Sequence, residues 1–372
     1  MTRQQRVLKV ADEGGHSTRI GKRGRHDSSG LIASPPFPLK TLRISVVIPL
    51  FQKAPYVRRC LDSVAAQTIG DFEVIVVDDG STDGGANWAL QRQDPRIRVL
   101  RQPNRGHGAA RNRGIAAARG EWVAFIDADD EWRPEFLEAT LAEAERGPNL
   151  VAVFTNVTDC QTGAPLLRPA ASGPVKDYFE FVLANRGLGM TSMGTLARTS
   201  ALLACGGFKA GVKVGEDPDA FARLAWQGPV AFVARELAIY HSDLPESSTK
   251  RSRLEGPAFP AAIGSYRDLL KAGQVPGDLA SSSRRFVDLL LLDHAASLIN
   301  HGSRRIALSV LVHECGPSAR ASGRYLSLLL RLALPHAVQT RLRGAFCRVR
   351  RAVAGGRTPD PAPLASRVAV VG

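Results

Sequence analysis

Three apolar runs, the first ending in Pro49 and the other two in acidic turns, decide the fold: Ile44-Ser45-Val46-Val47-Ile48-Pro49, Glu73-Val74-Ile75-Val76-Val77-Asp78-Asp79-Gly80-Ser81 and Trp122-Val123-Ala124-Phe125-Ile126-Asp127-Ala128-Asp129-Asp130. They are short and nearly all apolar, which is typical of parallel strands covered on both faces. Between the first two, the segment Pro55–Gln67 carries apolar residues at helical spacing. The order strand, helix, strand predicts an open α/β sheet with ligands bound at the carboxyl ends of its strands.

Carboxylates follow the second and third runs. Asp127 and Asp129 are expected on the same side of an extended segment, because side chains at i and i+2 of a strand point alike. Hard oxygen ligands of this kind suit Mg²⁺ or Mn²⁺. The alternative is a surface loop or a cap for a helix at Pro134–Glu145. For the turn that contains Asp78 and Asp79, the alternative is a plain turn with a helix cap.

The charge of the chain is concentrated in its terminal segments. The 372 residues carry a net charge of +14, with +5 in residues 1–40 and +10 in residues 304–357. Residues 41–303 carry −1. A basic protein suggests nucleic acid or an anionic membrane as a partner. Because the central part is nearly neutral, we expect no nucleic-acid-reading core, and the basic segments favour docking on something anionic.

The domain organisation follows from composition. We expect a disordered basic arm at 1–40, an α/β domain at 41–245, a proline-broken linker at 246–283 with at most one short helix, a basic helical appendage at 284–355 and a tail at 356–372. The five cysteines are scattered and lack zinc-ligand spacing, so reduced thiols are expected. The chain lacks an apolar run long enough to cross a membrane and a signal-peptide core, which predicts a cytoplasmic location.

Five segments in one order resemble the family 2 inverting glycosyltransferases of GT-A fold: Ser45–Pro49, Phe72–Asp83, Asn104–Gly114, Asp127–Asp130 and Gly215–Asp217. The resemblance covers about residues 43–245. It implies a Rossmann-like mixed, mostly parallel sheet flanked by helices. It also implies transfer of a sugar from a nucleoside diphosphate.

The resemblance assigns residues to the nucleotide sugar. Pro49 is assigned to nucleotide-sugar binding. Phe51, exposed by the turn expected at Pro49, would stack on the nucleobase, and Asp79 would accept a hydrogen bond from a ring N–H. Phe51 as a core aromatic is the alternative. Arg111 lies in a glycine-rich segment that fits neither the dinucleotide-binding nor the P-loop spacing, and it would reach the diphosphate.

The resemblance also assigns the metal and the base. Asp129 would bind Mg²⁺ or Mn²⁺, Asp127 would contact the ribose or the metal, and Asp130 is the reserve metal ligand. Asp217 would take the proton from the acceptor hydroxyl in an inverting displacement. Acidic residues that merely favour a helix N-terminus are the alternative.

Two positions depart from the family pattern. Pro218 replaces an aromatic residue that often follows the base, which puts the acceptor pocket in doubt. The family's Tyr-Arg-Xaa-His segment reads Tyr240-His241-Ser242-Asp243 here, and neither His241 nor Asp243 is assigned to a metal.

The sequence therefore predicts a metal-assisted inverting glycosyltransferase that uses a nucleotide sugar, UDP-linked in our interpretation, and a hydroxyl of a polysaccharide or lipid-linked oligosaccharide. A nucleotidyltransferase and a non-catalytic nucleic-acid-binding protein are the alternatives. The first should carry a glycine-rich basic signature after the first strand, and Leu50-Phe51-Gln52-Lys53 is not one. Over residues 304–351, basic residues alternate with apolar ones. This pattern predicts helices that lie on an anionic membrane, which would make the protein peripheral to the inner face of the cytoplasmic membrane. The alternative is that these helices pack on the catalytic domain or on a second subunit.

Overall fold

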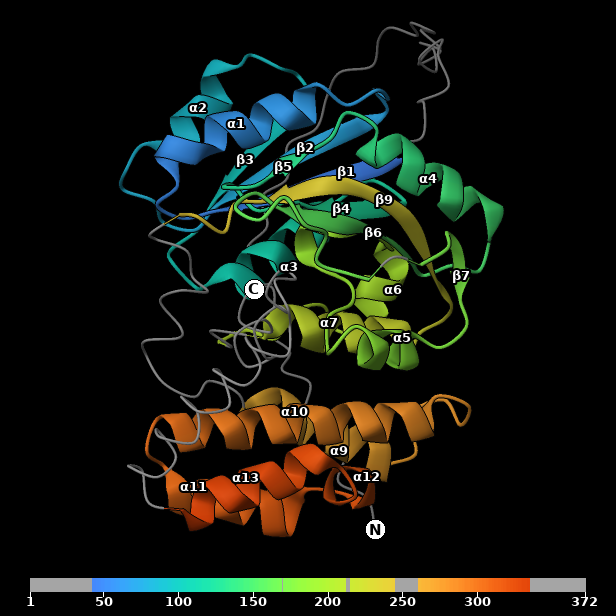
Figure 1. Ribbon diagram of the computed structural model, residues 1–372. Coiled ribbons are helices and arrows are strands. Elements are labelled where there is room, and N and C mark those ends of the chain that lie inside the picture. Colours follow the sequence, from blue (N-terminus) through green and yellow to red (C-terminus); the bar gives the residue numbers. More distant parts are fainter. Residues whose placement is uncertain (1–41, 169, 212–214, 245–259, 335–372) are drawn as a thin grey trace, which may run out of the picture. The chain divides into compact units, whose positions relative to one another are not determined.

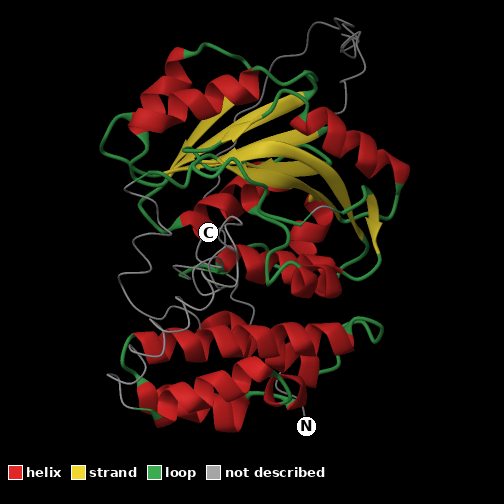
Figure 2. Cartoon of the chain, in the orientation of Figure 1, coloured by secondary structure: helices red, strands yellow, loops and turns green. Residues whose placement is uncertain are grey.

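The computed structural model describes residues 42–334, except residue 169, residues 212–214 and residues 245–259. A nine-stranded mixed sheet forms its centre, with the strand order β3-β2-β1-β4-β8-β6-β9-β5 and with β7 paired to β9 (Figures 1 and 2). The predicted arm at 1–40 and the tail at 356–372 lie outside the described residues. The predicted α/β class is confirmed.

The first four strands are parallel and adjacent. They are β1 (Ile44–Leu50), β2 (Phe72–Asp78), β3 (Ile97–Arg101) and β4 (Trp122–Phe125). Residues of β1, β2 and β4 are all buried, which matches their apolar sequence. The carboxyl ends of these strands therefore meet at one edge of the sheet.

Pro49 lies inside β1, and the prediction that it ends the strand is wrong. It pairs with Val77, and β1 continues to Leu50. The carbonyl of Val47 faces β4 and that of Leu50 faces β2, so by alternation Pro49 faces β4. The pairing of β1 with β4 ends at Val47 and Phe125, so the missing N–H of Pro49 breaks no ladder bond.

The sheet continues as a mixed one. Its remaining strands are β5 (Glu131–Trp132), β6 (Ala152–Asp159), β7 (Gly173–Val175), β8 (Thr195–Arg198) and β9 (Val230–Tyr240). Strand β8 runs antiparallel between β4 and β6, whereas β6 and β9 are parallel. The carboxyl ends of β6 and β9 consequently lie side by side.

Helices cover both faces of the sheet (Figure 1). One core layer includes residues of α1 (Ala54–Ala65), α2 (Gly85–Gln91) and α4 (Phe136–Arg146). The other includes residues of α3 (His107–Ala117), α5 (Tyr178–Ala184), α6 (Thr199–Ala204) and α7 (Glu216–Ala225). Helix α1 buries Val57, Cys60, Leu61 and Val64, which are the apolar positions that predicted it.

A group of helices follows the sheet domain: α9 (Pro260–Lys271), α10 (Ala280–Asn300), α11 (Arg304–Ser309), η2 (Val310–Glu314), α12 (Pro317–Arg320) and α13 (Gly323–Ala333). Helix α9 and the first residues of α10 lie within the segment 246–283, which was predicted as a linker. Among the described residues, no helix combines the length and the apolar character that a membrane crossing needs.

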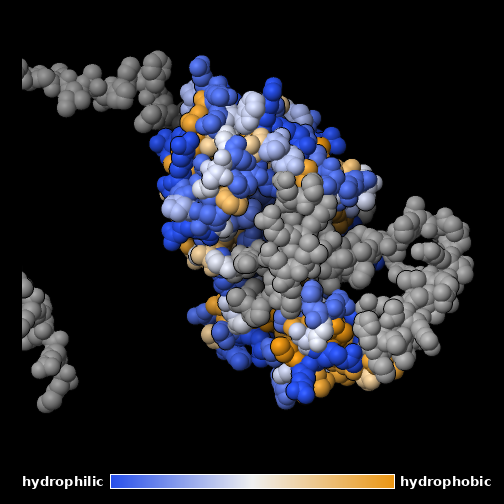
Figure 3. Space-filling view, turned by 90° about the vertical axis from the view of Figure 1, so that its left-hand side faces the viewer, coloured by the Kyte–Doolittle hydropathy of each residue, from blue (hydrophilic) through white to orange (hydrophobic). Residues whose placement is uncertain are grey.

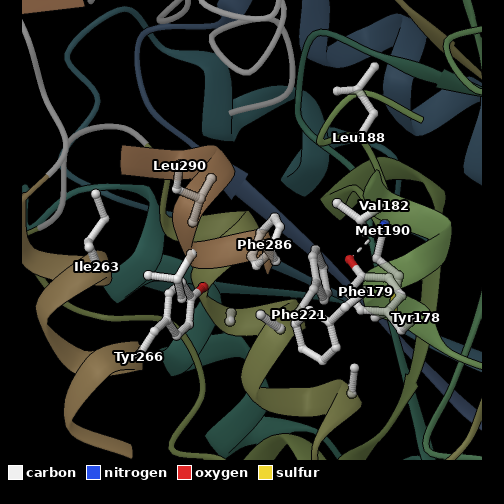
Figure 4. Close-up of a cluster of buried hydrophobic side chains, with 14 of the residues drawn as sticks. Tyr178, Phe179, Val182, Leu188, Met190, Phe221, Ile263, Tyr266, Phe286 and Leu290 are labelled. Carbon is white, nitrogen blue, oxygen red and sulfur yellow. Dashed lines mark hydrogen bonds between the residues drawn. The ribbon is translucent and has the colours of Figure 1, made fainter. Parts of the chain in front are cut away.

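The helical segment and the sheet domain share one apolar core (Figure 4). The rings of Phe179 on α5 and Phe286 on α10 lie 5.6 Å apart, and those of Trp226 and Tyr266 lie 5.6 Å apart. Tyr266 on α9 also donates a hydrogen bond to the carbonyl of Pro218 over 2.9 Å. Proline residues in 246–283 suggested a loose connection, but Tyr266 is only 1% exposed because its ring completes this core.

Phe286→Ala should lower the free energy of unfolding of the whole chain by about 3–5 kcal/mol, because it removes a buried ring and leaves a cavity. Urea unfolding followed by fluorescence measures this. Leu326→Ala is the control, since Leu326 on α13 is 58% exposed and should change stability little. Equal, small effects of the two substitutions would contradict a shared core.

Candidate active site

Predicted site residues gather at the carboxyl edge of β1, β2 and β4. Phe51 follows β1 and is half-buried, and it is not among the residues that form the apolar core clusters. Asp79 directly follows β2, and Asp127 lies shortly after the end of β4. The parallel register of the three strands brings these positions to one edge, as the sequence predicted.

Asp79 organises the loop before α3. Its Oδ1 accepts hydrogen bonds from Gln102 Nε2 at 2.7 Å and from Arg105 N at 2.9 Å, and its Oδ2 accepts one from Gly106 N at 2.8 Å. Asp79 is 2% exposed. A carboxylate has about four acceptor positions, so these three bonds leave room for one more donor.

A hollow of about 550 Å³ lies beside β2 and β3, and it is not where the predicted chemistry lies. It is lined by Asp78, by residues 80–82 and 84–87, and by residues 101–103. Phe51, Asp127, Asp129 and Asp217 are not among its lining residues. The clustered carboxylates are therefore the better guide to the site.

Arg111 forms the centre of a buried ionic cluster. Its Nη2 lies 2.7 Å from Asp127 Oδ1, and its Nη1 lies 2.9 Å from Asp217 Oδ1 and 3.2 Å from Glu216 Oε1. The Arg111 side chain is 1% exposed and lies 5.3 Å from the ring centroid of Phe208. In this structure the guanidinium binds carboxylates, and its contact with a diphosphate stays a prediction.

Ser192 closes the cluster, and sequence analysis missed it. Its backbone N donates to Asp217 Oδ2 over 3.1 Å, and its Oγ donates to Asp127 Oδ2 over 3.3 Å. Arg111 Nη2 donates to the same Oγ over 3.1 Å. Ser192 begins the short helix η1 (Ser192–Gly194), and no motif in the sequence distinguishes this serine.

Asp217 lies in the first turn of α7, where the partial positive charge of the helix favours a carboxylate. It is fully buried, and burial raises its pKa while Arg111 opposes that rise. Burial also raises the pKa of Glu216 to about 7, helped by the neighbouring Asp217 and opposed by Arg111. A base with a raised pKa accepts a proton more readily near neutral pH.

Asp127 behaves differently. Burial alone would raise its pKa, but Arg111 and His107 outweigh burial and the net pKa is lowered. Asp127 therefore stays ionised near neutral pH. The same carboxylates raise the pKa of Arg111 against the effect of its burial, so its positive charge is permanent.

Residues 127–130 form a turn, and the prediction of an extended segment is wrong. Asp130 N donates to the carbonyl of Asp127 over 3.0 Å, so the two carboxylates of Asp127 and Asp129 point to different partners. Asp129 Oδ2 lies 2.5 Å from Lys53 Nζ, whereas Asp127 binds Arg111. The i and i+2 rule for strands does not apply because β4 ends at Phe125.

Asp129 and Asp130 differ in their exposure to solvent. The Asp129 side chain is 18% exposed, whereas Asp130 is 2% exposed and accepts a hydrogen bond from His241 N over 2.9 Å. Burial raises the pKa of Asp130, and the neighbouring Asp129 and Asp127 raise it further. The turn thus concentrates negative charge, and Asp129 is a more accessible carboxylate than Asp130.

Comparison with known proteins identifies the class to which this site belongs. Residues 45–195 match the model of Glycosyl transferase family 2. Residues 45–195 are therefore a family 2 glycosyltransferase domain of GT-A fold.

Relatives match the same domain. The chain is 48% identical over 100 residues to the uncharacterized glycosyltransferase alr2836 of Nostoc sp., covering 26% of this chain and 31% of that protein. It is 40% identical over 115 residues to the putative glycosyltransferase EpsH of Bacillus subtilis, covering 30% and 33%. The match therefore spans about a third of the length of these relatives.

Two solved structures share the fold. S. aureus TarS in complex with UDP has a TM-score of 0.55 at 20% identity, covering 71% of this chain and 75% of that one. The mannosyltransferase PcManGT of Pyrobaculum calidifontis, in complex with GDP-Man and Mn²⁺, has a TM-score of 0.53 at 19% identity, covering 84% and 86%. At these identities the likeness supports the fold alone.

Proposed function

We propose that the protein transfers a sugar from a nucleoside diphosphate sugar, UDP-linked in our assignment, to a hydroxyl of a polysaccharide or lipid-linked oligosaccharide, with inversion. The observation that carries this proposal is the cluster in which Arg111 and Ser192 join Asp217 to Asp127. In a family 2 domain these two carboxylates are the expected base and donor-side ligand. Among the relatives, ExoW of Rhizobium meliloti is named a succinoglycan biosynthesis protein, which supports a glycan as the acceptor.

The residues of the 127–130 turn fit a hard divalent cation such as Mg²⁺ or Mn²⁺. Three carboxylates lie within four residues, and the buried thiol of Cys60 has a raised pKa, first through burial and then through these three carboxylates. Asp129 would hold the ion, with Asp127 or Asp130 in support. When bound, such an ion neutralises the charge of a departing diphosphate. Lys53 currently neutralises Asp129 and would have to move aside or bind the diphosphate itself.

The chain's own residues perform the remaining steps. Phe51 would stack on the nucleobase, and Asp79 would accept from its ring N–H with its remaining acceptor capacity. Asp217 would take the proton from the acceptor hydroxyl. Because Asp217 is fully buried and bound at both oxygens, the hydroxyl can reach it only after the surrounding side chains move. Arg111 sets the position and charge of Asp217, and so it acts as a positioning residue.

Asp129→Ala should abolish turnover and weaken Mn²⁺-dependent UDP binding, because it removes the carboxylate proposed to hold the ion. Diphosphate release from a panel of nucleotide sugars and calorimetric titration with UDP, each with and without Mn²⁺, measure the two effects. Asp62→Ala is the control: it also removes a carboxylate that forms a salt bridge, in this case with Arg92, but on the exposed face of α1. Full activity of the wild type in excess chelator would refute the metal-assisted mechanism.

Asp217→Asn should lower kcat by about 10²–10⁴, because the amide keeps the shape but cannot accept the proton. UDP affinity should change little. Glu216→Gln is the matched control, since it also neutralises a carboxylate paired with Arg111 but leaves the base in place, and its kcat should fall much less. Collapse of donor binding in Asp217→Asn, with turnover of bound donor retained, would make Asp217 a donor-site residue instead.

We also infer that the helical segment docks on an anionic membrane surface, at the inner face of the cytoplasmic membrane. Large apolar side chains are exposed there, and hydrophobic surface is visible on this part in Figure 3. They are Ile306, Leu308, Val312, Leu326 and Leu330. Residues 304–357 carry a charge of +10, and each basic residue near such a surface contributes about 1 kcal/mol. Part of the predicted region, residues 335–351, lies outside the described residues.

Vesicle co-sedimentation tests the docking. Truncation before α11 would expose the shared core, because Leu311 and Leu328 are buried in it. The better variant replaces Ile306, Leu326 and Leu330 by serine, and it should lose most binding to anionic vesicles. Leu203→Ser is the control, since Leu203 on α6 is 59% exposed and lies outside the helical segment. Equal, salt-insensitive recovery of the triple variant and the wild type would exclude this surface.

A further inference from the structure

Strands β6 and β9 bring two metal-ligating residue types together just beyond the last residues of their pairing. The two strands are parallel, and Asp159 is in register with Tyr240. Cys160 and His241 are the next residues, and Cys160 N donates to the carbonyl of Tyr240 over 3.0 Å. Asp243 follows two residues after His241. Cys160 lies 81 positions before His241 in the sequence, so the pairing of the two strands is what brings it close to His241 and Asp243.

The ligand atoms of these residues face one another. Cys160 Sγ lies 3.3 Å from Asp243 Oδ1, and His241 Nδ1 lies 3.8 Å from the same oxygen. One ligand atom from each of the three residues lies within 4.8 Å of the others. In a tetrahedral zinc site, bond lengths of about 2.0–2.3 Å place ligand atoms about 3.3–3.7 Å apart. Small side-chain movements therefore suffice to close the cluster on an ion.

The surroundings of His241 provide an independent indication. Its Nε2 lies 2.7 Å from Glu131 Oε1, and Glu131 is held in turn by Arg59 Nε at 3.0 Å. A metal-binding histidine nearly always gives its second ring nitrogen to such a carboxylate, which fixes the ring and the tautomer. With its proton on Nε2, the ring directs the lone pair of Nδ1 toward Asp243. The imidazole is thus oriented for coordination through Nδ1.

We propose that Cys160, His241 and Asp243 bind Zn²⁺, with a fourth position left for water or an added ligand. A thiolate and an imidazole select this borderline-soft ion, whereas Mg²⁺ and Mn²⁺ prefer the all-oxygen turn at Asp129. The Cys160 thiol, which donates to Asp243, loses its proton to solvent when the ion binds. The ion ties the ends of β6 and β9 together beside the Asp130 turn, to which His241 N is bonded.

Cobalt titration of the metal-free full chain tests the site without a donor or an acceptor. Co²⁺ replaces Zn²⁺ in such sites and gives a thiolate-to-cobalt charge-transfer absorption. We expect one equivalent of Co²⁺ to produce this band, Zn²⁺ to bleach it, and Cys160→Ser to abolish it. Cys205→Ser is the control, because Cys205 is also a half-buried thiol but lies at the end of α6. Absence of the band in the wild type, or its equal loss in Cys205→Ser, would overturn the proposal.

Two further variants separate this site from the others. Glu131→Gln should weaken Co²⁺ binding by about 10–100-fold while the thiolate band survives at saturation, since only the carboxylate behind His241 has changed. Asp129→Ala should leave both the affinity and the band unchanged. Asp243→Asn, at a side chain that is 51% exposed, checks the third ligand without disturbing the core, and it should weaken binding. Loss of the band in Asp129→Ala would show that the thiolate site depends on the acidic turn, and it would overturn the proposal of a separate site.

Discussion

The buried guanidinium of Arg111 is the interaction on which the arrangement of the site depends. It binds carboxylates from two distant places in the chain, the turn after β4 and the start of α7. Three carboxylates cannot be buried together without compensation, because like charges repel strongly where water is excluded. One cation and the hydrogen bonds of Ser192 supply part of that compensation. Removing one partner from such a buried ion pair typically costs about 3–5 kcal/mol.

The cluster also explains how one site can hold carboxylates in different protonation states. Asp127 is kept ionised by Arg111 and His107, whereas burial dominates at Glu216 and raises its pKa to about 7. Differences of this kind separate the roles of chemically similar groups. The pKa of Asp217, the proposed base, is therefore set by burial and by Arg111. Arg111 also pairs with Asp127, so it couples the charges of the two carboxylates.

The helical segment contributes to the same core as the catalytic face. Asp217, the proposed base, is the second residue of α7. Trp226 caps the other end of this helix, packs on Tyr266 and donates a hydrogen bond to Ser283 Oγ over 3.0 Å. The helical segment therefore packs against α7, the helix that carries Asp217, and stabilises its position. Leu326 and Leu330 on α13 remain exposed.

The sequence by itself determined the local structure and the inventory of chemical groups. Continuous apolar runs predicted β1, β2 and β4 because strands buried on both faces need no polar residues, and the order of the acidic segments predicted the family domain, which the family model confirms. The roles assigned to the site residues stay predictions. Only the tertiary structure decided which groups meet: Arg111 with Asp217, Ser192 with Asp127, and Cys160 with His241 and Asp243. It also decided that 127–130 form a turn and that Pro49 stays in β1. The physical reason is that local patterns report on burial and backbone preference, whereas pairing between distant charges depends on strand register and on the low dielectric of a core that exists only after folding.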